Sequence, residues 1–495
     1  MTGPAPTRPA APSPPSDPAD LGVLEAAALL RERKLSALEL AEACLVRTEG
    51  VNGGEPSFDG APDAINAWVR LYPELARDHA READERLARE GDAAPLVCGV
   101  PLAIKDLYGM AGLPLTASSR VLEGNVASED AVAWQRLREA GMVPLGHTHT
   151  HEFAAGGTTD QVGNPWALDR VAGGSSGGSA AALAARMTPA ALGSDTCGSL
   201  RIPAACCGVS SIKPSHGRIP IGGVIPLAAS LDHVGPMART VADCSALLAA
   251  LAEGGPETTA LMPPPLPMGE LPLAARPGPR PLEGLTVALT DRPGSADVKT
   301  EVASAYEEAR RACEQLGARV VELKSPWAFD WNDLSIVLMS DVWAFHSQFA
   351  DKHELYRPAI AEFVEIARRF TNAQAYMAAQ QRRAEGTAAW EDWFAANAVD
   401  LVLEPTLPIT PYERGPGYDR GHPGGPGDPM IALTALWDMT GMPVVTLPAA
   451  WNVGISLIAP RGQEAPAVQA AIDLQEHALP PATCDLRSPS RASRD

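Results

Sequence analysis

Two short glycine-rich stretches that carry serine are the parts of this sequence best suited to chemistry. The first is GGSSGGS at residues 173–179, and the second is DTCGSLR at residues 195–201. Glycine lets a backbone adopt positive φ angles and approach a ligand closely. Such turns can aim several N–H groups at one point, which is what the oxyanion of an acyl-transfer reaction needs. The two turns therefore indicate serine chemistry on a carbonyl group.

A serine that attacks a carbonyl needs a base, and neither turn has a histidine beside it. Upstream, the apolar run PLAIKD at residues 101–106 contains Lys105. Burial disfavours the charged form of lysine and lowers its pKa, so Lys105 at the end of a buried strand could act as a neutral base. Lysine and serine are paired in known variants of the serine-hydrolase triad. The alternative interpretation is an ordinary surface lysine.

These motifs occur in an order and spacing that resemble the amidase signature family, serine hydrolases with a Ser–cis-Ser–Lys triad. The resemblance covers roughly residues 21–475 and also includes SLDHVGPMARTVAD at residues 230–243. It implies that Ser199 is the nucleophile and that Ser175 is the bridging serine, held by a cis peptide. Lys105 would be the terminal base, and no metal or organic cofactor would take part.

The resemblance also implies where the substrate is held. The expected oxyanion donors are the backbone N–H groups of Thr196, Cys197, Gly198 and Ser199, and Gly173 and Gly174 are expected to contact substrate. Glycine is the family's usual residue at the position of Cys197, so we expect this thiol to be a small lining residue, although a cysteine nucleophile is an alternative. Asp195 and Arg201 flank the turn and are expected to form a structural ion pair.

Residues 327–399 are predicted to be a helical, aromatic-rich insertion. Helically spaced aromatic residues usually belong to a core, which we expect for most of them. In the family that the sequence resembles, the corresponding region helps to shape the acyl pocket. We therefore hypothesise that Trp343 and Phe345 contact an apolar or aromatic group of the substrate.

Three other patterns suggest different hydrolytic sites. His147, His149 and His151 alternate along the chain and could ligate zinc from one face of a strand. Residues 174–178 also satisfy G-x-S-x-G, the nucleophile elbow of α/β-hydrolases, which would make Ser176 the nucleophile. Asp232 and His233 are adjacent and invite a Ser-His-Asp interpretation. The family chemistry needs none of these, and we expect the histidines to be structural or to line the substrate site.

The expected function is an amidase that hydrolyses a linear carboxylic amide, an aryl or apolar amide, a carbamate or an ester through an acyl-enzyme on Ser199. The alternative is a protein like the tRNA-dependent amidotransferase A subunit, which belongs to the same family and works in a complex, drawing ammonia from glutamine. That subunit usually has glutamine after the arginine of the second turn, where this sequence has Ile202.

Composition limits the partners and the compartment that we expect. The chain of 495 residues has 40 basic and 60 acidic side chains, a net charge of −20, so we expect a small-molecule amide substrate and no nucleic acid. No apolar run approaches the roughly 18–20 residues of a membrane span, and we expect no membrane contact. Eight irregularly spaced cysteines suggest reduced thiols in the cytoplasm. A homodimer is plausible by resemblance.

The predicted fold class is α/β, with a single α/β/α domain around a large twisted mixed sheet over residues 21–478. The tails at residues 1–20 and 479–495 are rich in Pro, Ala, Ser or polar residues and are expected to be disordered. Residues 414–429 are expected to be a mobile loop. Among the local predictions are a helix capped by Ser179 and a strand that ends at Lys105.

Overall fold

The computed structural model describes residues 16–255, 267–370, 372–415 and 428–486. The predictions made for residues 1–15, 416–427 and 487–495 lie outside these ranges. Of the predicted N-terminal tail, Pro18–Asp20 form a 3₁₀ turn that is capped by the Asp17 side chain, and Ala19 is buried.

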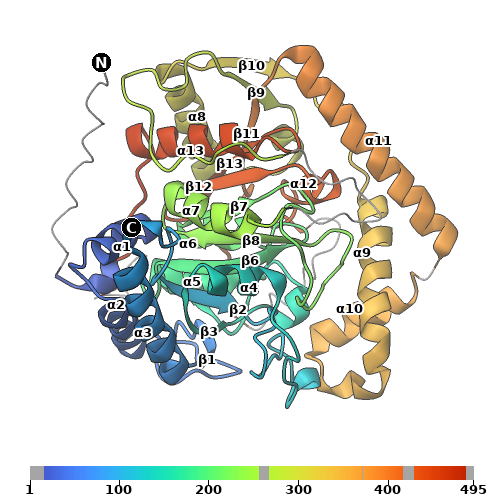
Figure 1. Cartoon of the computed structure of the whole chain (residues 1–495). Coiled ribbons are helices and arrows are strands. Elements are labelled where there is room, and N and C mark those ends of the chain that lie inside the picture. Colours follow the sequence, from blue (N-terminus) through green and yellow to red (C-terminus); the bar gives the residue numbers. More distant parts are fainter. Residues whose placement is uncertain (1–15, 256–266, 371, 416–427, 487–495) are drawn as a thin grey trace.

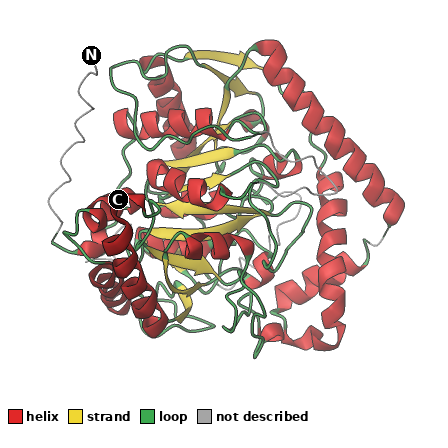
Figure 2. Ribbon diagram, in the orientation of Figure 1, coloured by secondary structure: helices red, strands yellow, loops and turns green. Residues whose placement is uncertain are grey.

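Eleven strands of the described residues form one mixed sheet, which runs through the middle of Figures 1 and 2. Its spatial order is β1-β3-β2-β6-β8-β7-β12-β13-β11-β9-β10. The strands are β1 (Trp68–Leu71), β2 (Pro101–Lys105), β3 (Val143–Thr148), β6 (Ala190–Asp195), β7 (Ser210–Lys213), β8 (His233–Ala238), β9 (Thr286–Thr290), β10 (Arg319–Leu323), β11 (Leu401–Pro405), β12 (Val444–Ala450) and β13 (Val453–Ile458). A separate hairpin pairs β4 (Gly163–Asn164) with β5 (Ala167–Val171).

Helices flank this sheet along its length. They are α1 (Val23–Arg31), α2 (Ala37–Val51), α3 (Pro73–Glu90), α4 (Val132–Glu139), α5 (Gly177–Ala184), α6 (Arg201–Cys207), α7 (Val241–Ala252), α8 (Thr300–Gln315), α12 (Ala435–Met439) and α13 (Glu464–His477). Every residue of β2 is buried, and α2 and α5 both pack against it. A strand covered in this way reads as a continuous apolar run, which is how β2 was recognisable in the sequence. The predicted α/β class and mixed sheet are confirmed.

The aromatic-rich segment forms three helices, α9 (Trp331–His346), α10 (Pro358–Arg368) and α11 (Ala373–Asn397). They stand together at one side of the molecule, yellow to orange in Figure 1, and α9 packs against both α10 and α11. The apolar face of α10 buries Ile360, Phe363, Val364 and Ala367. This face is directed toward the rest of the protein and contributes to the pocket described below.

The predicted Ser179 cap is wrong in its position. Helix α5 begins two residues earlier, at Gly177, and the Ser179 hydroxyl instead donates to the carbonyl of Leu192 at 2.8 Å. Tertiary contacts fix the start of this helix: the Gly177 N–H donates to Thr159 Oγ1 at 3.1 Å. A Cβ on Gly178 would lie 2.5 Å from the carbonyl oxygen of Ala67, so glycine lets α5 approach the neighbouring backbone.

Candidate active site

Sheet topology brings Lys105 and the second glycine turn to the same edge. Strands β2 and β6 are parallel neighbours, with Leu102 opposite Ala190 and Ala103 opposite Ala191. Lys105 is the last residue of β2, and Asp195 is the last residue of β6. Because the carboxyl ends of parallel neighbours meet at one edge of a sheet, the lysine lies beside the turn that carries Ser199. The first turn reaches this edge through the start of α5.

Three serine hydroxyls surround the Lys105 ammonium group. Its Nζ is 2.8 Å from Ser175 Oγ, 2.9 Å from Ser176 Oγ and 2.9 Å from Ser194 Oγ. Lys105 is fully buried, and burial lowers its pKa to about 7, although the charges of Asp195 and Asp232 act in the opposite direction. The surface-lysine alternative is therefore wrong. Ser194 was missed by the sequence analysis, although it stands at the end of the strand next to β2.

The backbone of the first turn is fixed by close approaches. The peptide between Gly174 and Ser175 is cis, and the Ser175 carbonyl accepts from the His151 N–H at 3.0 Å and from the Thr159 hydroxyl at 3.1 Å. A Cβ on Gly174 would lie 1.9 Å from the Thr158 carbonyl oxygen, so no other residue fits there. Gly173 has a φ of +74°, and a Cβ there would lie 2.8 Å from Pro203 Cα, so both glycines help to hold Ser175 in place.

Asp195 organises the second turn. Its carboxylate accepts from the N–H groups of Gly198 and Leu200 and forms an ion pair with Arg201, at 2.8 Å from Nε. Burial opposes ionisation, but the Arg201 guanidinium holds the pKa of Asp195 well below its usual range. The predicted ion pair between Asp195 and Arg201 is confirmed, and it ties the start of α6 to the end of β6.

The N–H groups of this turn fall into two sets. The Gly198 N–H is engaged by Asp195 at 2.5 Å, so it is not directed at a ligand. Within the described ranges, no acceptor contacts the N–H groups of Thr196, Cys197 or Ser199. These three of the four predicted oxyanion donors are free to bind an oxygen atom. Gly198 instead supplies its φ of +134°, which favours glycine.

Thr434, just before α12, holds the second turn from outside. Its hydroxyl donates to the Cys197 carbonyl at 2.5 Å, and its own carbonyl accepts from Arg201 Nη1 at 3.0 Å. A Cβ on Gly198 would lie 2.5 Å from Thr434 Oγ1, which shows how closely the two pack. Asp438 adds a second carboxylate to Arg201 at 2.5 Å. Thr434 was not predicted from the sequence, because nothing near it in the sequence marks this contact.

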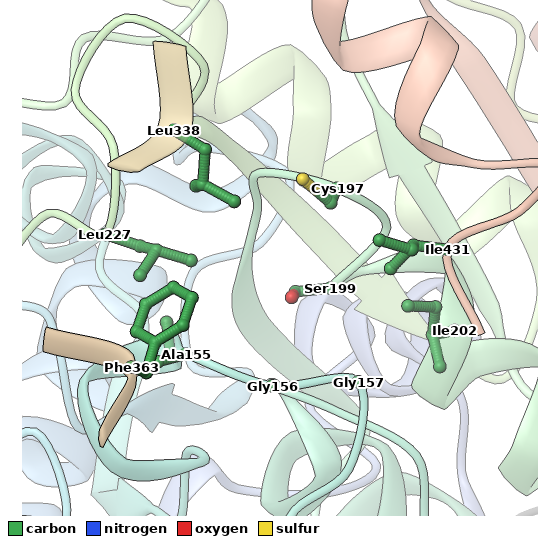
Figure 3. A pocket seen from close by; sticks show the side chains of 11 residues that line it. Ala155, Gly156, Gly157, Cys197, Ser199, Ile202, Leu227, Leu338, Phe363 and Ile431 are labelled. Atoms are coloured by element: carbon green, nitrogen blue, oxygen red, sulfur yellow. The ribbon is translucent and has the colours of Figure 1, made fainter. Parts of the chain in front are cut away.

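A pocket opens beside Ser199, as Figure 3 shows. It encloses about 30 Å³, and Ser199 is only 6% exposed. Its lining residues are Ala154, Ala155, Gly156, Gly157, Cys197, Ser199, Ile202, Leu227, Leu338, Phe363 and Ile431. Leu338 comes from α9 and Phe363 from α10, so the helical segment does contribute to the pocket.

The two aromatic residues that we singled out for substrate contact do not line this pocket. The Phe345 ring packs against Phe153 and Phe349, with centroids 6.2 and 5.7 Å apart, and Trp343 is half-buried on the same helix. Cys197 does line the pocket. Burial and the nearby Asp438 and Asp195 carboxylates raise the pKa of its thiol well above the usual value, which disfavours a thiolate nucleophile.

The histidines of the 147–151 segment have separate surroundings. His147 contacts the Tyr72 hydroxyl at 3.0 Å and the Tyr108 carbonyl at 3.1 Å. His149 contacts the Ser57 carbonyl at 2.8 Å and the Gln161 amide at 3.1 Å. Among the described residues, no group of three His, Cys, Asp or Glu side chains has the geometry of a metal site. The geometry supports structural roles for His147 and His149.

The other two alternatives also lack geometric support. Asp232 accepts from the Thr196 hydroxyl at 2.6 Å, whereas His233 contacts Lys213 Nζ at 3.3 Å, so these neighbours do not form an Asp-His pair. The Ser176 hydroxyl is fully buried and donates to the Ser194 carbonyl at 3.2 Å. Ser199, in contrast, faces the pocket.

A buried lysine among serine hydroxyls, next to free N–H groups and a pocket, is an arrangement of the kind that serine hydrolases use. The Amidase family model matches residues 58–467, and the chain belongs to this family. It is therefore an amidase-family enzyme that acts on carbon–nitrogen bonds.

Several known proteins are similar to this chain in sequence or in structure. The A subunit of glutamyl-tRNA(Gln) amidotransferase from Chromohalobacter salexigens is 32% identical over 92% of this chain and 96% of its own length. The corresponding protein of Roseiflexus castenholzii is 40% identical over 62% of this chain, and there the chain spans only 60% of the relative's length. The structure of 6-aminohexanoate cyclic dimer hydrolase is 27% identical and has a TM-score of 0.80, covering 96% of this chain and 100% of that one.

These relatives contradict our prediction of the partners. We expected a small-molecule substrate, no nucleic acid and possibly a homodimer, but proteins similar over more than 90% of this chain are named as A subunits of glutamyl-tRNA(Gln) amidotransferase. The expectation is wrong because the net charge of one chain describes only its own surface, and says nothing of an assembly in which other chains contribute. In the part of the chain that the structure describes, no helix is long and apolar enough to cross a membrane.

Proposed function

We propose that this enzyme cleaves the C–N bond of a carboxylic amide by transferring the acyl group to Ser199. The observation that carries the proposal is the buried Lys105, with a pKa near 7, placed 2.8 Å from Ser175 Oγ. The adjacent Ser176 N–H donates to the Ser199 carbonyl at 3.3 Å, so the two turns are in direct contact. A neutral lysine, a bridging hydroxyl and a nucleophilic hydroxyl are the parts that this chemistry needs.

The hydrogen bonds around Lys105 favour one direction of proton transfer. A neutral amine has two N–H groups and one lone pair. The Ser176 hydroxyl already donates to the Ser194 carbonyl, so its oxygen accepts from Lys105. With Ser176 and Ser194 as the two acceptors, the lone pair is left to accept the Ser175 proton. Ser176 and Ser194 would thus orient the base.

The reaction then proceeds as an acyl transfer through an ester on Ser199. Ser199 Oγ forms a bond to the amide carbon as its proton moves to Ser175 and the Ser175 proton moves to Lys105. The N–H groups of Thr196, Cys197 and Ser199 stabilise the oxyanion. The C–N bond breaks as the relay returns a proton to the leaving nitrogen. Water, activated by the same relay, releases the acyl group as a carboxylic acid.

Trapping of the acyl group tests this proposal. When the purified protein is incubated with a neutral amide and hydroxylamine, we expect a hydroxamate product, because a second nucleophile intercepts the Ser199 ester. Prior treatment with a metal chelator should leave the rate unchanged. Loss of activity that zinc restores would contradict the proposal and favour the histidine segment at residues 147–151.

A second candidate function is that of an amidotransferase A subunit, which would use glutamine and require partner chains. Identity of 32% over 92% of this chain to such a protein favours it. The same chemistry at Ser199 would serve both functions, with ammonia passed to an acceptor in the second. Ammonia release from glutamine that appears only after partner chains are added would support this candidate. A cytoplasmic location suits both, since all eight cysteines are free thiols.

We predict that Thr434 positions the oxyanion donors. Thr434→Val removes the hydroxyl that holds the Cys197 carbonyl, so kcat should fall by about tenfold, less than the ~10²–10³-fold typical of deleting a direct donor. KM should change little, because the pocket side chains stay in place. Thr434→Ser keeps the hydroxyl and should retain near-normal kcat. Equal losses in both variants, in step with a lower thermal midpoint, would contradict this role.

A further inference from the structure

The lining of the pocket beside Ser199 is uncharged and mostly apolar, which favours one chemical kind of acyl group. Among its lining residues in the described structure, none has a carboxylate, ammonium, guanidinium or imidazole group. Four large apolar lining side chains, from Leu227, Leu338, Phe363 and Ile431, lie around Ser199 in Figure 3, and Ile202 lies near Ile431. A charged group that entered this pocket would lose its water and find no charged partner in the lining.

Acidic groups close to the lining are already used by the protein. Asp428, beside Gly157, accepts from the Met430 N–H at 2.9 Å. Asp232 lies behind Leu227, and its two carboxylate oxygens accept from the Leu227 N–H at 3.0 Å, the Ala228 N–H at 3.2 Å and the Thr196 hydroxyl at 2.6 Å. Burial raises its pKa to about 7. A carboxylate with this many internal donors, behind the pocket wall, is poorly placed to bind a substrate ammonium group.

From this lining we infer that the substrate is a neutral amide with a compact, apolar acyl group. Glutamine is then not the acyl donor, which argues against the second candidate function. The inference rests on the proposed acyl transfer to Ser199 and narrows it to one substrate class. The α-ammonium and α-carboxylate groups of glutamine would have to enter, or lie against, a wall of aliphatic and aromatic side chains. The bulky Leu338 and Phe363 side chains in the wall also favour a short acyl chain.

Pairs of amides with matched shape test the charge preference. Butyramide and β-alaninamide differ in a terminal methyl against an ammonium group, and 4-methylpentanamide and succinamate differ in an isopropyl against a carboxylate group. We expect kcat/KM to be at least 100-fold higher for the neutral member of each pair, and glutamine to be as poor as succinamate. Equal or better cleavage of glutamine or of the charged members would overturn the inference while leaving acyl transfer to Ser199 intact.

Variants of the wall test the size preference. Leu338→Ala and Phe363→Ala should shift the optimum toward longer acyl chains by about tenfold or more in relative kcat/KM, since one methylene in an apolar pocket is worth roughly 10–200-fold. Leu334→Ala is the matched control, because Leu334 is a buried leucine of α9 that does not line the pocket. A shift of the same size in the control would overturn the assignment of these side chains.

A second measurement does not depend on turnover. Neutral amides should protect Ser199 from labelling by a fluorophosphonate, and their charged isosteres should not, whether or not partner chains are needed for catalysis. Protection by glutamine and succinamate at the same concentration would overturn the inference. Failure of the probe to label Ser199 at all would instead remove the proposed function on which it rests.

Discussion

We expect Ser199→Ala to abolish amide cleavage and labelling by a fluorophosphonate, and Ser176→Ala to keep both. Loss of a serine nucleophile usually lowers kcat by roughly four to six orders of magnitude, because only binding and oxyanion stabilisation are left. Ser199 lines the pocket, next to free N–H groups, and its carbonyl accepts the Ser176 N–H. The Ser176 hydroxyl is turned inward to Lys105 and the Ser194 carbonyl. Mass spectrometry of the adduct identifies the labelled residue.

Two variants, Cys197→Ala and Ser176→Ala, serve as controls. Cys197→Ala should keep activity within about tenfold, since a buried thiol with a raised pKa is not a nucleophile. Ser176→Ala removes one acceptor from Lys105, and a loss of about tenfold is compatible with an orienting role. An active Ser199→Ala together with a dead Ser176→Ala would reverse the assignment and restore the nucleophile-elbow interpretation.

Most of the candidate site residues could be found from the sequence because they lie in short, constrained motifs. Lys105 ends a continuous apolar run, which indicates a fully buried strand. The glycines of the first turn occupy positions where a Cβ would strike backbone atoms, as Gly174 does at 1.9 Å. Such positions tolerate few residues, so the pattern is specific. The Asp195–Arg201 ion pair was predictable because the two residues flank the same turn.

Contacts between distant segments were harder to predict. Trp343 and Phe345 were chosen because they lie in the region that helps to shape the acyl pocket in the family that the sequence resembles, yet Leu338 and Phe363 line the pocket beside Ser199. The periodicity of a helix identifies its buried faces but not which neighbour each face meets. In α9, buried positions face both a packed aromatic cluster and the pocket. Their roles in substrate selection are still predictions, which the wall variants address.

Thr434 illustrates the same limit at a single hydrogen bond. It lies 237 positions from Cys197 in the sequence, and it reaches the turn because the segment before α12 packs over α6. Ser194 is a smaller omission of the same kind. Its role depends on β6 being the parallel neighbour of β2, and strand order is not encoded in local motifs.

The activity of the enzyme should rise with pH through an apparent pKa near 7 and then level off. Lys105 must be neutral to accept a proton, and its pKa of about 7 means that the neutral form dominates above that pH. Lys105→Ala should remove this rise and lower kcat by roughly three orders of magnitude or more. Lys105→Arg should be equally inactive at every pH, because a guanidinium stays charged. Profiles of kcat/KM between pH 5 and 9 measure both effects.

Two other buried groups titrate in the same range and supply the controls. Burial lowers the pKa of Lys213 to about 7 and raises that of Asp232 to about 7. Lys213 donates to the Met442 carbonyl at 2.6 Å, on the far side of β8 from β6 in the sheet order. Lys213→Met should therefore keep the rise near pH 7, whereas Asp232→Asn should keep a rise but move it to lower pH, because the Asp232 charge raises the pKa of Lys105. A profile that flattens in either control and persists in Lys105→Ala would contradict the assignment of the base.

Lys105 and Lys213 should affect the pH dependence of stability in the same way, but only Lys105 should affect the pH dependence of catalysis. Each has a folded pKa below the value of about 10.4 for an exposed lysine, so between pH 7 and 10 the unfolded chain binds more protons than the folded one. The free energy of unfolding should then rise with pH across this window, and removal of either lysine should reduce the slope. Only loss of Lys105 should also remove the rise in kcat/KM. These two results together would show that burial accounts for the effect of both lysines on stability. They would also show that contact with Ser175 accounts for the effect of Lys105 on kcat/KM.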